Sequence, residues 1–419
     1  MASPSPPAEA PGREILLQRA YWRLFWGQAL GLIGTGVATV ALALLAYRLV
    51  GRDAAAVFGT ALAIKMATYV LVTPIAAGFV RRLPPGPLLV ALDLARAALL
   101  IALPFVQTVP GLFLLILLFQ VGSALFVPTA QAVTSELLPD EQDYAEALAR
   151  SRLVYELEGV LSPAVAGLLL FLLDAPFLFD VAAVAFVASA VLLAGAGFPR
   201  PAPGRAGGPL DSVRRGLSTF LAEPALRGLT ALNLAAALAT ATVTVVTVHL
   251  VRTELDGTER MMTAALVAAG AGSMVGAVLV PMLTDRLPLR ATMLAGGFGI
   301  GLVFLLGTVG PGFWTALPLW AALGLAGALA VTPAGMLLRA LAPPGEKLGL
   351  YATHFALANA ASMLAYPAAG WLSSELGSRP TLAIFAALAL AAVAAASRLW
   401  PPSEPHAAAP VRPFLPRRP

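Results

Sequence analysis

Long apolar segments alternate with short polar ones along almost the whole chain, and most apolar segments reach about 20 residues, enough to cross a bilayer as one helix. The pattern predicts twelve spans, near residues 22–49, 54–80, 87–107, 110–135, 147–173, 176–198, 225–252, 260–284, 289–309, 312–341, 347–374 and 379–400. A polar stretch rich in proline and glycine separates the sixth span from the seventh. The chain is therefore expected to contain two sets of six spans.

The second half of the chain repeats features of the first at an offset of 204 positions, from residue 80 to residue 284. The matching segments are 80–84 with 284–288, Pro163 with Pro367 and, after a shift of one residue, 139–142 with 344–347. Repeats at matching places in a hydrophobic chain are typical of transporters, in which two related halves enclose a site near the membrane midplane.

These patterns predict an all-α membrane protein with twelve transmembrane helices in two pseudo-symmetric six-helix halves. The N-terminal half covers residues 22–198 and the C-terminal half covers 223–400. The proline-rich ends, 1–21 and 401–419, are expected to be disordered cytoplasmic tails, and 199–222 is expected to be a cytoplasmic linker.

The composition supports the membrane assignment. Hydrophobic residues make up 59% of the chain, charged residues make up 12%, and the mean hydropathy is +0.83; soluble domains have about 25% charged residues. The net charge of +5 needs no nucleic-acid partner, because basic loops on one side of a membrane explain it. The absence of cysteine excludes disulfides, thiolate metal sites and cysteine nucleophiles.

Basic residues also predict the orientation of the chain. Most of the 27 Lys and Arg residues fall in the segments that share a side with both termini. Cytoplasmic loops of membrane proteins carry an excess of Lys and Arg. Both termini and the linker are therefore expected in the cytoplasm, with the protein in the cytoplasmic (inner) membrane as a multi-pass protein.

The loop between the second and third predicted spans shares a motif with its repeat between the eighth and ninth. The second copy consists of Gly276, Asp285, Arg286 and Arg290. The first copy has Gly78 and Arg82, but Arg81 stands where the second copy has aspartate. With this motif, residues 20–400 resemble the major facilitator superfamily of transporters, especially its bacterial drug and siderophore exporter branch, which includes macrolide-efflux-like proteins.

The resemblance implies that these two loops are gating loops, which cap helix ends with charge and hold neighbouring helices together in one transport state. For Arg81, a basic loop residue that only sets the membrane orientation is an equal alternative.

The fifth predicted span resembles the antiporter motif of exporters in the superfamily. The residues that carry this resemblance are Gly159, Ser162, Pro163, Ala166 and Gly167. Small residues permit close helix contact, and proline removes a backbone hydrogen bond and favours a bend. The resemblance implies export; ordinary helix packing is the alternative.

Charged residues inside the spans point to a coupling site, because a charge in the bilayer costs about 2.5–3.5 kcal/mol unless it has a partner or a watery cavity. Lys65 lies near the middle of the second span, and Glu156 and Glu158 lie at a matching depth in the fifth. We expect one of these carboxylates to pair with Lys65 and to release it when protonated. Alternatively, Glu156 pairs locally with Arg152 and Glu158 lies at a helix interface.

Other polar residues within the spans have narrower expected roles. Asp93 and Arg96 are three positions apart, so they are expected to form a structural ion pair on one helix face. His354 titrates near neutral pH and is either a proton relay or an interfacial cap. Candidates for the substrate cavity are Gln28, Tyr69, Gln120, Gln131, Asn233 and Asn359.

The sequence thus predicts a secondary transporter and not an enzyme: a proton-coupled exporter, or antiporter, of an amphiphilic small molecule that works by alternating access. Neither a P-loop for ATP nor a hydrolase motif is present. The expected partners are the substrate, protons and the lipid bilayer. The protein is expected to be a monomer, and no cofactor or metal site is expected. Two alternatives stay open: a divalent-metal exporter on the same fold, for which three His and no Cys offer few ligands, and a receptor or scaffold without transport.

Overall fold

Helices make up nearly all of the chain that the structure, a computed structural model, describes. The described residues are 11–50, 54–80, 83–170, 174, 176–199, 209–310, 312–343, 346–400 and 402. The α-helices are α1 (Pro11–Val50), α2 (Ala54–Ala67), α3 (Thr73–Val80), α4 (Pro85–Ala102), α5 (Val109–Leu137), α6 (Glu141–Leu170), α7 (Phe177–Ala194), α8 (Pro209–Ala222), α9 (Pro224–Ala241), α10 (Thr247–His249), α11 (Glu259–Thr284), α12 (Leu289–Gly307), α13 (Phe313–Val331), α14 (Ala334–Leu341), α15 (Lys347–Leu376) and α16 (Ser378–Leu399). Shorter turns are the π-helical η2 (Thr68–Val72), η4 (Thr242–Val246) and η5 (Leu250–Glu254) and the 3-10 turn η3 (Leu103–Phe105).

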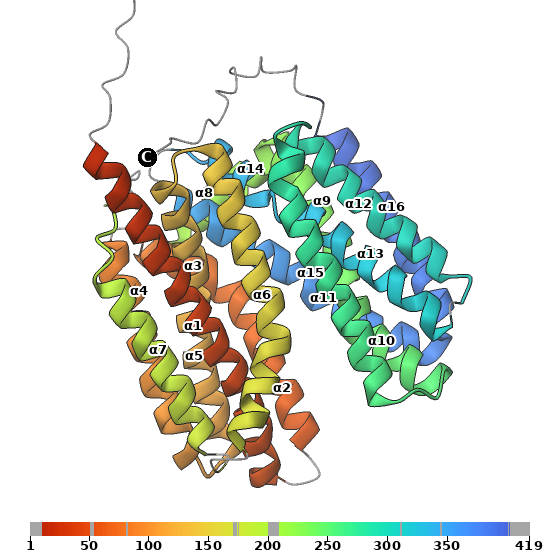
Figure 1. The fold of residues 1–419 in the computed structure, drawn as a ribbon, viewed down its shortest axis with the longest axis horizontal. Helices are drawn as coiled ribbons and strands as arrows, with labels where there is room; N and C mark the ends of the chain where they lie inside the picture. The colour runs from red at the N-terminus through yellow and green to blue at the C-terminus, as the bar shows by residue number, and fades with distance from the viewer. Residues whose placement is uncertain are drawn as a thin grey trace, which may run out of the picture.

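Two bundles of helices lie side by side, one formed by α1–α7 and the other by α9–α16 (Figure 1). Helix α8 packs on both bundles, against α3 in the first and against α9 and α15 in the second. The start of α1 lies at the same end of the molecule as α8, and α10 lies at the other end (Figure 1). We call these the α8 end and the α10 end.

The two halves contact each other mainly through two pairs of helices that the internal repeat relates. One pair is α6 with α11; the other is the α2–η2–α3 segment with α15, which also packs on α5. The offset between positions 80 and 284 relates the α2–α3 segment to α11, and α6 to α15, so it converts each pair into the other. Two copies of one unit around a pseudo-two-fold axis give this arrangement.

Nine of the predicted spans contain a helix that is long and apolar enough to cross a membrane, judged by length and composition within the described residues. The other three predicted spans are the α2–α3 segment, α6 and α15. In the first of these the apolar helix Ala63–Gly78, which runs through η2, is too short within the described residues to count, and polar residues lower the hydropathy of the other two. These three segments form the contacts between the halves, so they face protein more than lipid.

Helix α1 begins at Pro11, which corrects the predicted tail boundary at residue 21. Its first buried residues are Ala20, Tyr21 and Leu24, which lie in one cluster with Leu89 of α4, whereas Ile15 and Leu16 before them are exposed. The remaining tail residues, 1–10 and most of 401–419, lie outside the described residues.

The predicted linker also contains a helix, α8, where the sequence analysis expects only a polar connection. Phe220 is buried among residues of the second half, and a Cβ atom on Gly216 would lie 2.2 Å from Thr353 Oγ1. Helix α8 therefore packs closely on α15. Its apolar residues recur every three or four positions, which is the helical signal that the proline-rich stretch before it concealed.

Glycines bring α11 and α13 into close contact. A Cβ atom on Gly272 would lie 1.8 Å from the carbonyl oxygen of Ala321, and one on Gly276 would lie 2.6 Å from that of Leu325. Gly276 thus lies in a helix–helix contact, upstream of the loop whose motif it shares. Small residues at such contacts let helix backbones approach each other inside a membrane.

Candidate functional site

A cavity of about 310 Å³ lies within the N-terminal half of the molecule. Side chains of α1, α2, η2, α4, α5 and α6 line it, and Phe355 of α15 contributes from the other half. A volume of this size is at the lower end of the range for small-molecule sites. Hydroxyl and amide groups on its wall are those of Gln28, Thr35, Thr39, Tyr69, Ser123, Gln131, Thr134, Tyr144, Ser151 and Tyr155.

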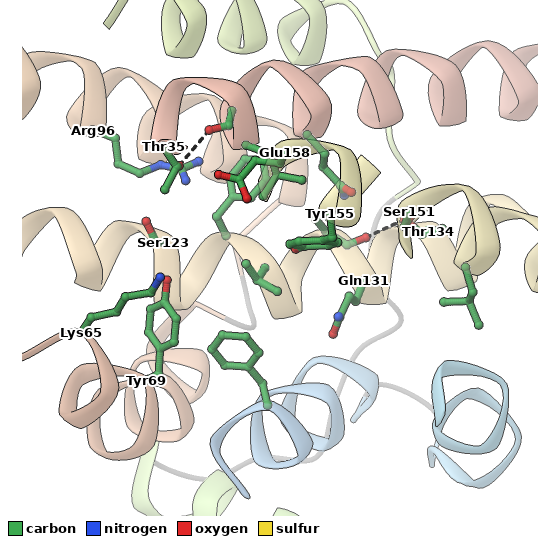
Figure 2. Close-up of a pocket in the computed structure, with 18 of the residues that line it drawn as sticks. Thr35, Lys65, Tyr69, Arg96, Ser123, Gln131, Thr134, Ser151, Tyr155 and Glu158 are labelled. Atoms are coloured by element: carbon green, nitrogen blue, oxygen red, sulfur yellow. Dashed lines mark hydrogen bonds between the residues drawn. The ribbon is translucent and has the colours of Figure 1, made fainter. Parts of the chain in front are cut away.

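Lys65 and Glu158 both lie on the wall of this cavity. The Nζ atom of Lys65 is 5.8 Å from the centre of the Tyr69 ring, and Glu158 is the acidic residue that acts on Lys65 electrostatically. Figure 2 shows the side chains of Lys65, Tyr69, Ser123 and Glu158 around the same space. The structure thus brings the second and fifth predicted spans together at these two charges.

Glu156 lies on a different face of α6 and contacts the C-terminal half. Its Oε1 atom is 2.6 Å from Nη2 of Arg152 and accepts a hydrogen bond of 2.7 Å from Ser273 Oγ of α11. Arg152 Nε in turn donates to Ser273 Oγ at 3.0 Å. This corrects the expectation that Glu156 could pair with Lys65. Residues 151, 155 and 158 share the cavity face of α6, whereas 152 and 156 point toward α11.

Asp93 and Arg96 form a buried ion pair on α4. Ser189 Oγ donates a hydrogen bond of 2.6 Å to Asp93 Oδ2, and the Arg96 guanidinium lies over the rings of Phe126 and Phe186, at 4.3 and 4.5 Å. Arg96 also lines the cavity. The pair therefore places a neutralised cation in the cavity wall.

A set of contacts joins the halves at the α8 end, and we call it the latch. The hydroxyl groups of Tyr144 and Tyr351 are 2.7 Å apart, and Arg339 donates hydrogen bonds to backbone carbonyls in the turn before α6. Lys347 Nζ and Glu136 Oε1 are 3.8 Å apart. Neither the two tyrosines nor Arg339 is among the candidate residues predicted from the sequence. The echo between 139–142 and 344–347 precedes both tyrosines and was the available signal.

The remaining cavity candidates fall in different places. Gln28, Tyr69 and Gln131 line the main cavity, and Gln120 lines a smaller pocket beside it. Asn233 and Asn359 are not among the described residues that line the main cavity or the smaller pocket. Asn359 Nδ2 donates a 2.8 Å hydrogen bond to the Phe355 carbonyl on its own helix.

His354 lies behind the cavity wall, between α8 and α9. Its ring stacks on that of Phe220, with centres 6.4 Å apart, and its Nδ1 atom is 3.4 Å from Asn233 Nδ2. His354 is not among the described residues that line the cavity. These contacts favour a packing role over a direct proton relay to Lys65.

Only part of the first predicted gating loop lies within the described residues. Gly78 is buried, and Arg81 and Arg82 lie outside the described residues. In the second loop Asp285 and Arg286 are exposed.

Arg290 of the second loop motif binds another helix. Its Nη2 atom donates to the Ser397 carbonyl at 2.9 Å and its Nε atom to the Trp400 carbonyl at 2.5 Å. Arg290 therefore caps the C-terminal end of α16, where a cation is favourable.

The antiporter-like segment lies on α6. Ala166 is fully buried, as expected for a small residue at a helix contact. The side chains of Gly159, Ser162, Pro163 and Gly167 lie outside the described residues. Within the described part of the chain no three His, Cys, Asp or Glu residues are placed to hold a metal ion.

Two related helical halves, apolar helices long enough to cross a membrane and a cavity that Phe355 of the second half helps to line are features of multi-pass membrane transporters. The family model of the Major Facilitator Superfamily matches residues 24–250 and 229–417, so the chain belongs to this superfamily. A comparison with curated protein sequences finds no match.

Solved structures of transporters share the fold over nearly the whole chain. The human organic anion transporter MFSD10 (TETRAN) superposes with a TM-score of 0.72 at 14% identity, covering 94% of this chain and 100% of its own. A bacterial homologue of the iron transporter ferroportin, in an outward-facing state, gives 0.73 at 18% identity, with 91% and 99% covered. The E. coli fucose:proton symporter FucP gives 0.67 at 14% identity, with 93% and 98% covered. At these identities the likeness establishes the fold.

Proposed function

We propose that the protein is a proton-coupled exporter of an amphiphilic small molecule and works by alternating access. The observation that carries the proposal is the cavity wall that holds Lys65 and Glu158. A partly buried carboxylate that trades between a cation and a proton can couple proton movement to a conformational change. The aromatic and apolar groups beside these charges suit an amphiphilic substrate.

In this proposal Glu158 is the proton carrier. Protonation removes the negative charge that acts on Lys65, and this loosens the electrostatic tie between α2 and α6. Both helices also contact the C-terminal half, α6 through α11 and α2 through α15. A change in the interaction between Lys65 and Glu158 therefore reaches the α6–α11 and α2–α15 contacts, which must rearrange when the two halves move relative to each other.

Export and antiport are the direction and mode that we propose from the resemblance of the α6 segment to exporters. The distribution of Lys and Arg supports a cytoplasmic membrane location with both termini in the cytoplasm. The latch would then lie on the cytoplasmic side. We propose a monomer as the working unit, because both halves of the site lie in one chain.

Proton flux in everted membrane vesicles tests this function. The vesicles receive a panel of amphiphilic drugs, siderophore-like compounds and divalent metal ions, and vesicles with a Lys65→Ala variant serve as the control. Proton release that an organic compound evokes, and that the variant loses, is the expected result. No response to any compound would contradict the proposal and favour a receptor or scaffold that does not transport.

A divalent-metal exporter is the second candidate, because one of the structural neighbours is a homologue of the iron transporter ferroportin. The site gives this candidate little support. The described residues of the cavity wall include one carboxylate, Glu158, and no histidine, whereas transition metals favour several His, Asp or Cys ligands. Proton release that only the metal ions evoke in the vesicle assay would favour the metal exporter.

A further inference from the structure

Lys65 lies where two cavities meet. Beside the main cavity is a side pocket of about 80 Å³, and both are lined by Thr35, Thr39 and Lys65. The other described walls of the side pocket are mostly apolar side chains, among them Leu100 and Phe119. A ligand that entered both spaces would hold an apolar group in the side pocket and have its polar part next to Lys65.

Lys65 is the charge that the two cavities share. Among the described residues that line the side pocket, Lys65 is the only charged one. In the described wall of the main cavity the other charges are Arg96 and Glu158. Arg96 is neutralised by Asp93, which is fully buried behind the wall.

Lys65 differs from Arg96, because none of the salt bridges between described residues includes it. Glu158 is the acidic residue that acts on Lys65 electrostatically. An ammonium group offers three hydrogen-bond donors and no acceptor. Its strongest partners are anionic oxygens, which form charge-assisted hydrogen bonds. The junction thus suits a negatively charged group more than a neutral or positive one.

We infer that the site takes an amphiphilic organic anion, with a carboxylate or sulfonate at Lys65 Nζ and a small apolar group in the side pocket. The inference rests on the proposed function, because it takes the cavity as the substrate site. On the main-cavity side, the ring of Tyr69 lies 4.9 Å from that of Phe355, so the rest of the ligand meets aromatic surface. An amphiphilic cation with its apolar group in the side pocket would place its positive charge next to the ammonium group of Lys65, and the two charges would repel each other.

Binding of matched probes to the full-length protein, purified in detergent, tests this charge preference. The probes are phenylbutanesulfonate, phenylbutanol and phenylbutylamine, which share an apolar part and differ in charge, and thermal unfolding reports binding. We expect the sulfonate to bind at least about 10-fold more tightly than the alcohol or the amine. Lys65→Met should weaken sulfonate binding about 10- to 100-fold, as expected for a lost charge-assisted hydrogen bond, and Lys65→Arg should restore most of it.

Arg398→Met is the matched control, because Arg398 is an exposed cation near the end of α16 and does not line either cavity. It should leave sulfonate binding unchanged. Equal or tighter binding of the amine or the alcohol would overturn the inference, and so would equal losses in Lys65→Met and Arg398→Met. Should Lys65→Met not fold, the order of the three probes on the unaltered protein decides.

Failure of the inference can be told from failure of the proposed function. If a cationic or neutral compound drives proton flux in the vesicle assay while the sulfonate does not bind, the protein is a transporter and the anion inference is wrong. If the sulfonate binds but no compound of the panel, with the sulfonate added to it, drives flux, the anion site stands and proton-coupled transport is wrong.

Discussion

The hydroxyl groups of Tyr144 and Tyr351 lie 2.7 Å apart, although 207 positions separate the residues in the chain. Tyr144 belongs to α6 in the first half and Tyr351 to α15 in the second, and both side chains are buried. Tyr351 also donates to the Gly335 carbonyl at 3.1 Å. The hydrogen bond between the two tyrosines is the centre of the latch that joins the two halves at the α8 end. Its loss should therefore change the balance between transport states.

Tyr144→Phe removes one hydroxyl and keeps the ring, so it should weaken the latch without unfolding the helices. Hydrogen bonds between membrane helices contribute about 0.6 kcal/mol on average and at most about 1.7 kcal/mol, so the population open at the α8 end should rise about 3- to 20-fold. Because the chain has no cysteine, spin labels at Glu141→Cys and Ala340→Cys can report the distance between the halves. An unchanged distance distribution would show that the tyrosine pair does not hold this state.

The buried pair of Asp93 and Arg96 predicts an asymmetry between single and double substitutions. Asp93→Asn leaves the Arg96 charge buried without a counter-ion, which should cost about 3–5 kcal/mol of stability. The double variant Asp93→Leu with Arg96→Met removes both charges and should be more stable than the single variant. Thermal unfolding in detergent gives the comparison; a double variant less stable than the single one would mean that the pair contributes through more than charge balance.

Close packing predicts different outcomes for a glycine inside the contact between α11 and α13 and for a glycine of α13 outside it. Gly272→Ala on α11 would place a methyl group 1.8 Å from the Ala321 carbonyl oxygen, and overpacking of this kind costs about 1–3 kcal/mol or more. Gly327→Ala on α13 is the matched control, because no atom lies within 4 Å of its new Cβ. The control should fold as well as the parent or slightly better, since alanine favours helix by about 0.5–1 kcal/mol. Equal melting temperatures for the two variants would contradict the packing argument.

Much of the architecture follows from the sequence, because the length of an apolar run and the internal repeat can both be read directly from the order of residues. Apolar runs locate the spans, and the echo between residues 80–84 and 284–288 relates the halves. The missed elements have weaker local signals. The start of α1 lies before the long apolar run that marks the first span, and α8 follows a stretch rich in proline and glycine.

The candidate site is less accessible to sequence reasoning, because it depends on how each helix is rotated. Depth along the spans brings Lys65 to the same level as Glu156 and Glu158, but only the rotation of α6 decides that Glu158 lines the cavity while Glu156 binds Ser273. His354 illustrates the same limit. Its pairing with Asn233 depends on contacts between helices that no local pattern specifies.

The comparison of Glu158→Gln with Glu156→Gln tests whether Glu158 carries the coupled proton. Both variants remove one carboxylate from α6, but Glu158 lines the cavity with Lys65 and Glu156 bonds to Arg152 and Ser273. Substrate and proton movement are measured together in proteoliposomes with a compound that the vesicle assay identifies. The account predicts that Glu158→Gln still moves substrate down its gradient but no longer moves protons with its flux, and that Glu156→Gln stays coupled. Full proton coupling in Glu158→Gln would contradict it.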